Sequence, residues 1–447
     1  MNIYPIRTWI GVCSVCLLAL SSAFSAAGVS LALTGLIMAS ALDSPGLCRW
    51  IRSDPIAWII LCWAAWVVFR AVMPNVYPAT PENRWSGIVD GLVIGAVPAV
   101  LVAWWIRHVP GRWLTVMALA ASGLLIAAIR KADWSNPGTY LISQRMTLGL
   151  SNNGGSFFAG IVLIGLLSLA VPLLVRTIRR GRVWWSATIV SALFSFFTII
   201  IIVLSRSRQV WIAFCALALA TLAWQLRLRG IAAIRTACAR YRAAVLVGTA
   251  IAVLIVAVSG KLIVDRMGQE SATWRALAAL DFDQVPPSSI GERIGMWQVS
   301  ADLIEKYPWL GIGPAAERGA FAAAHNQILQ GRTFAHFHNT YINIAVVWGV
   351  PALVPWLVLL ILLARGSFRS LRLPDASRRE LAGFVLSAGF LFLIVCLVTV
   401  RHDDIHGGSL VTILIACALV SGSRMGTSPD GGNGGEFLTR SRGTEVA

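Results

Sequence analysis

The chain has 447 residues, of which 57% are hydrophobic and only 13% charged, and its mean hydropathy is +0.73. A water-facing surface needs far more polar residues, so this composition excludes a soluble globular protein and indicates a multi-spanning membrane protein. The net charge of +17 would suit a nucleic-acid partner, but the arginines lie mostly in alternate connectors between apolar segments, which is a topology signal.

Apolar segments of about 15–24 residues recur along the chain, near the length at which a helix crosses a hydrocarbon core of about 30 Å. Strands of a membrane barrel would instead alternate apolar and polar residues over about ten positions. The predicted fold is therefore an all-α polytopic membrane protein with about twelve transmembrane helices, at 9–24, 27–42, 55–73, 86–106, 112–129, 155–175, 184–204, 210–226, 243–262, 341–364, 381–400 and 408–422.

These segments divide the chain into five parts. We expect an N-terminal transmembrane bundle with spans 1–6 (1–183), spans 7–9 (184–264), one large loop (265–340), spans 10–12 (341–425) and a disordered tail (426–447). The positive-inside rule assigns the arginine-rich connectors and both termini to the cytoplasm. The large loop then faces the periplasm, if the membrane is the inner membrane of a Gram-negative bacterium.

Polar residues are concentrated in the large loop, between Asp265 and Asn339, which holds three of the six histidines, His325, His336 and His338. In so apolar a chain, this is where chemistry is expected. Near its end, Gly311-Ile312-Gly313-Pro314 predicts a tight turn that redirects the chain.

Residues 289–306 in this loop are expected to form an amphipathic helix along the membrane surface. Its apolar face carries Ile290, Ile294, Trp297, Ala301 and Ile304 at helical spacing. Arg293 falls at the edge of that face, where a lipid head group would sit, whereas Glu292 points to the other side.

His338 and Asn339 stand at the start of the tenth predicted span, and Asn339 is expected to be the N-cap of its helix. The positive end of the helix dipole disfavours an imidazolium, so His338 is expected to stay neutral and able to accept a proton. It is therefore a candidate general base, although an interfacial histidine that only anchors a span would look the same.

Arg206 and Arg208 lie between two apolar spans with almost no connector. Arginines held so close to hydrocarbon are costly unless they meet an anion, and the planar guanidinium suits phosphate oxygens. The alternative is snorkelling to lipid phosphates, but these arginines lie on the side that the positive-inside rule disfavours.

Other polar groups have weaker support. His336 and His338 could bind zinc with His325 or a carboxylate of the polar loop, but no HExxH helix or cysteine ligand accompanies them. Asp281 and Asp283 could bind a metal, or be solvated loop carboxylates. Further candidates for contacts with a sugar acceptor, or for a structural role only, are Asp90, His402, Asp403, Asp404 and His406.

Three stretches resemble the superfamily of O-antigen ligases and O-antigen polymerases, bacterial envelope glycosyltransferases of type C. They are Ser207-Arg208-Gln209-Val210-Trp211, then Arg293 with Trp297 and Tyr307-Pro308-Trp309-Leu310-Gly311-Ile312-Gly313, and finally His338-Asn339-Thr340-Tyr341 with Gly349. The resemblance covers about 184–364. Gln209 stands where the family often has glycine, which leaves open whether Arg206 or Arg208 is the equivalent arginine; register with Trp211 favours Arg208.

The resemblance implies transfer of a preassembled O-antigen glycan from undecaprenyl diphosphate to a hydroxyl of the lipid A–core oligosaccharide, with inversion, at the periplasmic face and without ATP or metal. It implies His338 as general base and Arg208 and Arg293 as the groups that hold the diphosphate. The remaining residues expected to bind substrate are Arg206, His336, Asn339, Tyr341 and Trp297.

Three other functions stay open at this stage. An O-antigen polymerase and a protein O-oligosaccharyltransferase belong to the same superfamily. A lipid-linked glycan transporter belongs to another class, but it should carry polar residues and broken helices near mid-membrane and repeated halves. In this sequence polarity gathers on one face, which favours surface chemistry.

Overall fold

The computed structural model describes residues 4–109, 113–136, 139–142, 146, 148, 150, 154–180, 185–205, 207–240, 268, 270–282, 284–400 and 405–422. Over these ranges the regular structure is helical and contains no strand, which confirms the all-α class. The predicted span 243–262 and the predicted tail 426–447 lie outside the described residues.

The helices follow the apolar segments of the sequence. Those before residue 241 are α1 (Tyr4–Ser21), α2 (Ala26–Leu42), α3 (Ser44–Ser53), α4 (Pro55–Val72), α5 (Pro81–Ile94), α6 (Val97–Ile106), α7 (Trp113–Lys131), α8 (Thr139–Ile142), α9 (Gly154–Arg180), α10 (Trp185–Leu204) and α11 (Arg208–Arg240). Those after residue 267 are α13 (Ser271–Ala278), α14 (Ser289–Lys306), α15 (Glu317–Ala323), α16 (Thr340–Trp348), α17 (Val350–Ser370), α18 (Ala376–Cys396) and α19 (Ile405–Gly422).

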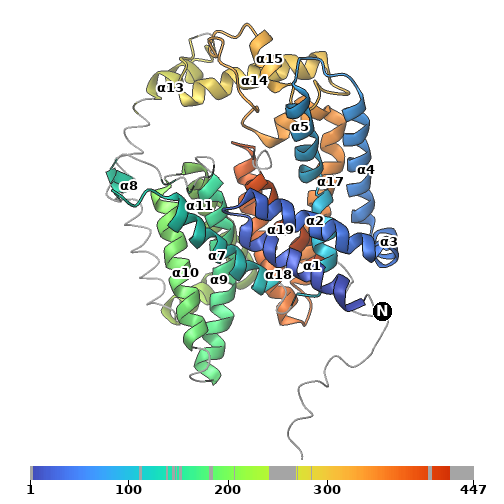
Figure 1. The fold of residues 1–447 in the computed structure, drawn as a ribbon. Coiled ribbons are helices and arrows are strands. Elements are labelled where there is room, and N and C mark those ends of the chain that lie inside the picture. The colour runs from blue at the N-terminus through green and yellow to red at the C-terminus, as the bar shows by residue number, and fades with distance from the viewer. Residues whose placement is uncertain are drawn as a thin grey trace, which may run out of the picture.

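Six of the described helices are long and apolar enough to cross a membrane, or up to eight if each of two bent pairs forms one span. Shorter apolar helices occur at Ile6–Ser21, Gly154–Ser168 and Thr188–Leu204. Together they indicate a multi-pass membrane protein. Figure 1 shows α13, α14 and α15 gathered beyond one end of these helices, so the polar loop forms a separate layer at one end of the bundle.

Two predicted spans are interrupted, so the prediction of continuous helices was wrong for both. Residues 86–106 are divided between α5 and α6, which are bent by 50°, and Ala96 at the break has a φ of 63°. Residues 341–364 are divided between α16 and α17 by Gly349, whose φ is 88°. A hydropathy pattern cannot reveal a residue with left-handed backbone conformation inside an apolar segment, so it does not predict these breaks.

The polar loop has its own hydrophobic core. Its buried residues come from α14, α15 and the segments beside them, and they reach α16 through Val346: Met296, Val299, Leu303, Ile312, Ala316, Ala320, Phe321, Leu329, Phe337 and Val346. Burial of these side chains makes the loop a packed layer whose polar groups have fixed positions.

The chain turns at 308–314, as the sequence predicts, and this turn packs against the break between α16 and α17. The Ile312 amide donates to the Val346 carbonyl at 2.8 Å, and the Val350 amide donates to the Pro308 carbonyl at 2.8 Å. A Cβ at Gly311 would lie 2.4 Å from the Val346 oxygen, and one at Gly349 would lie 2.1 Å from the Trp309 oxygen. Only glycine allows the two backbones to approach this closely.

Arg70, at the end of α4, fixes the other side of this turn. Its side chain is 1% exposed, and its guanidinium donates to the carbonyls of Leu310 (2.7 Å) and Gly311 (3.3 Å). It also donates to Pro74 (3.2 Å), beside the negative end of the α4 dipole. Next to it, Asn75 Nδ2 donates to the Pro314 carbonyl at 2.8 Å. The first half of the chain thereby holds the turn that leads to α15.

Replacing Gly349 with alanine tests this packing. We expect Gly349→Ala to destabilise the protein by more than about 1 kcal/mol, because the new Cβ meets backbone and the positive φ is strained. Gly383→Ala in α18 is the matched control: its Cβ meets nothing within 4 Å, so the melting temperature should stay constant or rise. Thermal unfolding of the detergent-solubilised protein, followed by tryptophan fluorescence, measures both, and equal melting temperatures would contradict the packing role.

Candidate active site

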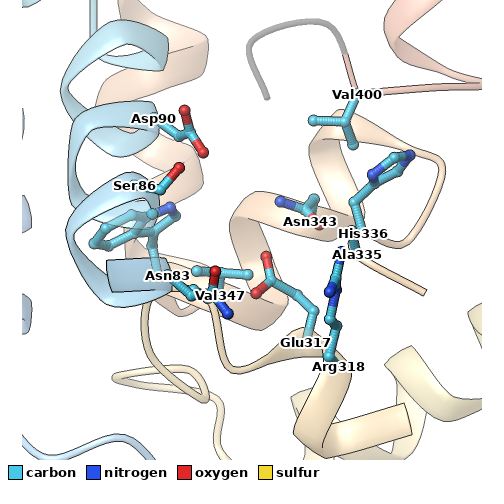
Figure 2. Close-up of a pocket in the computed structure, with 13 residues that line it drawn as sticks. Asn83, Ser86, Asp90, Glu317, Arg318, Ala335, His336, Asn343, Val347 and Val400 are labelled. Atoms are coloured by element: carbon cyan, nitrogen blue, oxygen red, sulfur yellow. The ribbon is translucent and has the colours of Figure 1, made fainter. Parts of the chain in front are cut away.

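A cavity of about 240 Å³ lies between α5, the start of α15, the segment before α16, and α16 itself. Figure 2 shows Ser86 and Asp90 on one side of this cavity and His336 and Asn343 on the other. Its polar lining residues are Asn83, Ser86, Asp90, Glu317, Arg318, His336 and Asn343. Carboxylates, amides and hydroxyls of this kind are the groups that bind sugar hydroxyls through hydrogen bonds.

The α5 side of the cavity is a polar stripe at helical spacing. Asn83, Ser86 and Asp90 fall on one face of α5. Gly87, on the same face, permits close approach, because a Cβ there would lie 2.8 Å from the Ala315 nitrogen. The predicted candidate Asp90 is therefore brought to the same cavity as His336.

The turn described above places the opposite charges of Glu317 and Arg318 at the cavity. Ala315 has a φ of 59°, which reverses the chain directly before α15. Glu317 is 8% exposed and Arg318 is exposed. The cavity thus has an acidic and a basic group at neighbouring positions.

The segment before α16 carries the two histidines. Phe337 is fully buried and packs on Phe321 with ring centroids 4.7 Å apart. His336 and His338 flank Phe337 in the chain, and the centroids of their two rings are 4.4 Å apart. His336 lines the cavity, whereas His338 is half-buried and is not among the lining residues.

The backbone of His338 has a φ of 52°, a region that non-glycine residues occupy sparsely. Such a conformation persists only where the surroundings hold it, and it is found often at functional sites. Its neighbours in the chain are held on both sides: the Phe337 amide donates to Asn343 Oδ1 at 3.3 Å, and Asn339 Nδ2 donates to the Leu397 carbonyl.

Asn339 is the N-cap of α16, as the sequence predicted. Its Oδ1 accepts hydrogen bonds from the amides of Tyr341 and Ile342 at 2.9 and 3.1 Å, and its Nδ2 donates to the Leu397 carbonyl at 3.0 Å. The Tyr341 hydroxyl donates to the Leu393 carbonyl at 3.3 Å. Both side chains therefore fasten α16 to the end of α18.

Arg208 opens α11 at the same end of α18. Val210, two residues later, approaches Gly160 of α9 together with Leu391 of α18, and Arg208 itself is exposed. Arg293 lies half-buried on α14. Neither arginine lines the 240 Å³ cavity. Arg206, Asp283, His402, Asp403 and Asp404 lie outside the described residues.

Helix α14 has a second apolar face that the sequence analysis missed. Its buried residues lie about 180° from the predicted stripe, on the side toward which Glu292 projects: Gly291, Gly295, Met296, Val299, Ser300 and Leu303. Glu292 forms an ion pair with Arg332 there. On the predicted stripe, Trp297 is 38% exposed, while Ile294 packs against Ala276.

Sequence reasoning also missed Glu317, Arg318 and Asn343. The first two follow a glycine turn, and their approach to α5 depends on that turn's geometry. Asn343 was detectable as an amide inside an otherwise apolar segment. The spacing of Asn83, Ser86 and Asp90 was a second available signal, since it forms a helical stripe.

Metal ligation has no support among the described ranges. Within them, no group of three or more histidine, cysteine, aspartate or glutamate side chains lies close enough to hold an ion. His325 is exposed and does not line the cavity. His406 contacts the Ser22 carbonyl through Nδ1 at 2.8 Å.

Part of the chain is similar to a known protein family. A family model described as O-antigen ligase matches residues 193–357. This match supports membership of the O-antigen ligase superfamily. The matched region contains Arg208, Arg293, His336 and His338, whereas Asp90 lies before it. No curated protein sequence matches the chain.

The Asn339 cap provides a test of how the histidine segment is held. Asn339→Ala should lower stability by about 1 kcal/mol through loss of the cap, and further through loss of the bond to Leu397. Asn339→Asp keeps the acceptor but not the donor, so its melting temperature should lie between those of wild type and Asn339→Ala. Thermal unfolding measures the order, and an Asp variant as unstable as the Ala variant would contradict the capping role.

Proposed function

We propose that this superfamily member is an O-antigen ligase. In this proposal it transfers a preassembled glycan from undecaprenyl diphosphate to a hydroxyl of the lipid A–core oligosaccharide. The observation that carries the proposal is the paired histidine segment, strained at His338 and next to a polar cavity of sugar-binding character, within the region that matches the O-antigen ligase model.

The reaction needs a base for the acceptor hydroxyl. In the proposed step, the acceptor oxygen attacks the anomeric carbon from the face opposite the diphosphate, and the bond from that carbon to the diphosphate oxygen breaks with inversion. His338 takes the hydroxyl proton, with His336 as the neighbouring alternative. Asp90, Asn343 and the other polar cavity residues would hold the acceptor sugar.

The leaving group is undecaprenyl diphosphate, whose charge grows as the bond breaks. Arg208 and Arg293 would hold this diphosphate and stabilise that charge, because guanidinium groups bind phosphate oxygens through paired hydrogen bonds. Trp297, exposed beside Arg293 on α14, would contact the lipid-borne donor. Positioning and charge stabilisation then account for the chemistry without ATP or a metal ion.

The proposed location follows from charge. The positive-inside rule places the arginine-rich ends of the helices and both termini in the cytoplasm, and the polar loop on the periplasmic side of the bacterial inner membrane. This proposed topology includes the approximately twelve transmembrane spans predicted from the sequence. An O-antigen polymerase or protein glycosyltransferase would share this arrangement and differ in the acceptor.

Ligation by purified protein tests the proposal. With undecaprenyl-diphosphate-linked O-antigen, lipid A–core and EDTA, and no ATP, wild type should form high-molecular-weight lipopolysaccharide. His338→Ala should reduce the rate by at least about 100-fold, the usual contribution of a general base. His325→Ala, an exposed loop histidine outside the cavity, should leave the rate unchanged.

The product distinguishes the alternatives. Glycan that lengthens while still lipid-linked would identify a polymerase, and absence of either product from folded wild-type protein would favour a transporter. If His336→Ala abolished ligation while His338→Ala kept the wild-type rate, the general base would be His336.

Lysine substitutions test the diphosphate contacts. Arg208→Lys and Arg293→Lys keep the charge but remove the planar fork, so each should lower kcat, and alanine at either position should lower it by about 100-fold or more. Arg275→Lys, on exposed α13, is the matched control and should have the wild-type rate. Equal rates for all three lysine variants would exclude bidentate binding of phosphate.

A further inference from the structure

A second, larger cavity of about 650 Å³ lies away from the polar loop, between the α3–α4 junction, the last turns of α17 and the end of α19. Its lining includes Trp50, Asp54, Ile56, Leu362, Arg365 and Arg369. One side of the cavity is closed by the contact of α17 with α19. The two helices approach so closely there that a Cβ at Gly366 would lie 2.8 Å from the Gly422 Cα.

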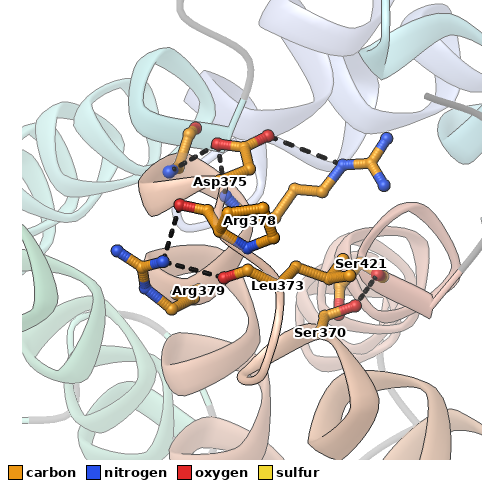
Figure 3. Close-up of polar contacts among 8 residues, drawn as sticks. Ser370, Leu373, Asp375, Arg378, Arg379 and Ser421 are labelled. Atoms are coloured by element: carbon orange, nitrogen blue, oxygen red, sulfur yellow. Dashed lines mark hydrogen bonds and ion pairs between the residues drawn. The ribbon is translucent and has the colours of Figure 1, made fainter. Parts of the chain in front are cut away.

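The arginines of this cavity differ from Arg378 and Arg379, whose side chains have partners. Figure 3 shows Arg378 beside Asp375 and Arg379 beside the Leu373 carbonyl. Arg365 and Arg369 are exposed, and among the described residues the side chain of neither forms a hydrogen bond or ion pair. They are four residues apart on α17, so both project to the same side.

The cavity carries a net positive charge. Asp54 is its acidic lining residue, and Asp54 Oδ1 already accepts the Ile56 amide at 2.9 Å as the cap of α4. Two guanidinium groups therefore share the cavity with one carboxylate, that of Asp54, which already accepts a hydrogen bond. An anion of about phosphate size would complete the arrangement.

The same face of α17 continues into an apolar surface. Ile361, Val358 and Val354 stand four, seven and eleven positions before Arg365 and are 63%, 38% and 62% exposed. At 1.5 Å per residue, this stripe extends about 16 Å from the arginines, close to the depth of one leaflet, which is half of about 30 Å. A lipid with an anionic head group matches a charged cavity above an apolar stripe of this length.

The cavity lies at the arginine-rich end of the helices, next to α3, which is bent by 90° from α2 and carries Arg49 and Arg52. Trp50 of α3 is buried at the cavity and stacks on Trp104 with centroids 5.8 Å apart. A bent helix with basic residues and a tryptophan is typical of the membrane interface. The positive-inside rule assigns this end to the cytoplasmic leaflet, where basic pockets between helices bind anionic head groups.

We propose that this cavity binds the phosphate head group of an anionic phospholipid from the cytoplasmic leaflet. Arg365 and Arg369 hold the phosphate, Trp50 and Leu362 border the glycerol region, and an acyl chain lies along Val354, Val358 and Ile361. The site is separate from the proposed glycan-transfer site, and its occupancy does not depend on the ligase assignment.

Lipid binding to the delipidated full-length protein in detergent micelles tests the proposal, with bound lipids counted by native mass spectrometry. Wild type should bind phosphatidylglycerol in preference to phosphatidylcholine. Arg365→Ala with Arg369→Ala should weaken phosphatidylglycerol binding about 25-fold, from about fivefold per arginine. Arg365→Lys with Arg369→Lys should retain part of the affinity, since the charge remains.

The matched control is Arg372→Ala, which removes an arginine of the same connector that does not line the cavity. It should bind phosphatidylglycerol like wild type, and an equal loss would show that general surface charge suffices, which overturns the proposal. Equal binding of phosphatidylcholine also overturns it. Displacement of the lipid by millimolar inorganic phosphate would identify a free-phosphate site instead. The phosphatidylcholine comparison and the phosphate displacement both use wild-type protein, so they test the proposal even if an alanine variant fails to fold.

Discussion

The guanidinium of Arg70 is the contact on which the position of the polar loop depends. A buried cation costs several kcal/mol unless hydrogen bonds satisfy it. Its acceptors are backbone carbonyls at the end of α4 and in the turn at 310–311. Movement of the turn would leave this cation without those acceptors. The turn is also bonded to Val346 of α16, so a single contact region joins the N-terminal helices, the polar loop and α16.

The candidate site is built between these joined parts. One wall is α5, which precedes the region that matches the O-antigen ligase model, and the rest of the lining, apart from Val400, comes from that region. Glycines at 87, 311 and 349 let three backbones approach closely. Packing of backbone on backbone fixes the walls, and the polar side chains then project into the space that remains. The glycines at 311 and 349 in the family-like stretches are therefore structural.

The sequence predicted local features well and spatial ones poorly. The cap at Asn339 and the turn at Gly311 were correct because short-range hydrogen bonding and glycine geometry decide them. Glu317 and Asn343 were missed because they line the same cavity as Asp90 only after the turn has folded onto α5. The face of α14 that packs inward was also missed, since Met296, Val299 and Leu303 form a second apolar stripe that periodicity alone cannot rank against the first. The breaks at Ala96 and Gly349 depend on tertiary contacts.

A cryo-electron microscopy structure of the protein in lipid nanodiscs with undecaprenyl diphosphate tests the central claim most directly. That claim is that the polar loop and the start of α11 together form one phosphate-binding and glycan-transferring site. The account predicts diphosphate density contacted by both Arg208 and Arg293, on the same face as His338 and the cavity of Asp90 and His336. Diphosphate bound away from both arginines, with His338 remote from it, would contradict the account.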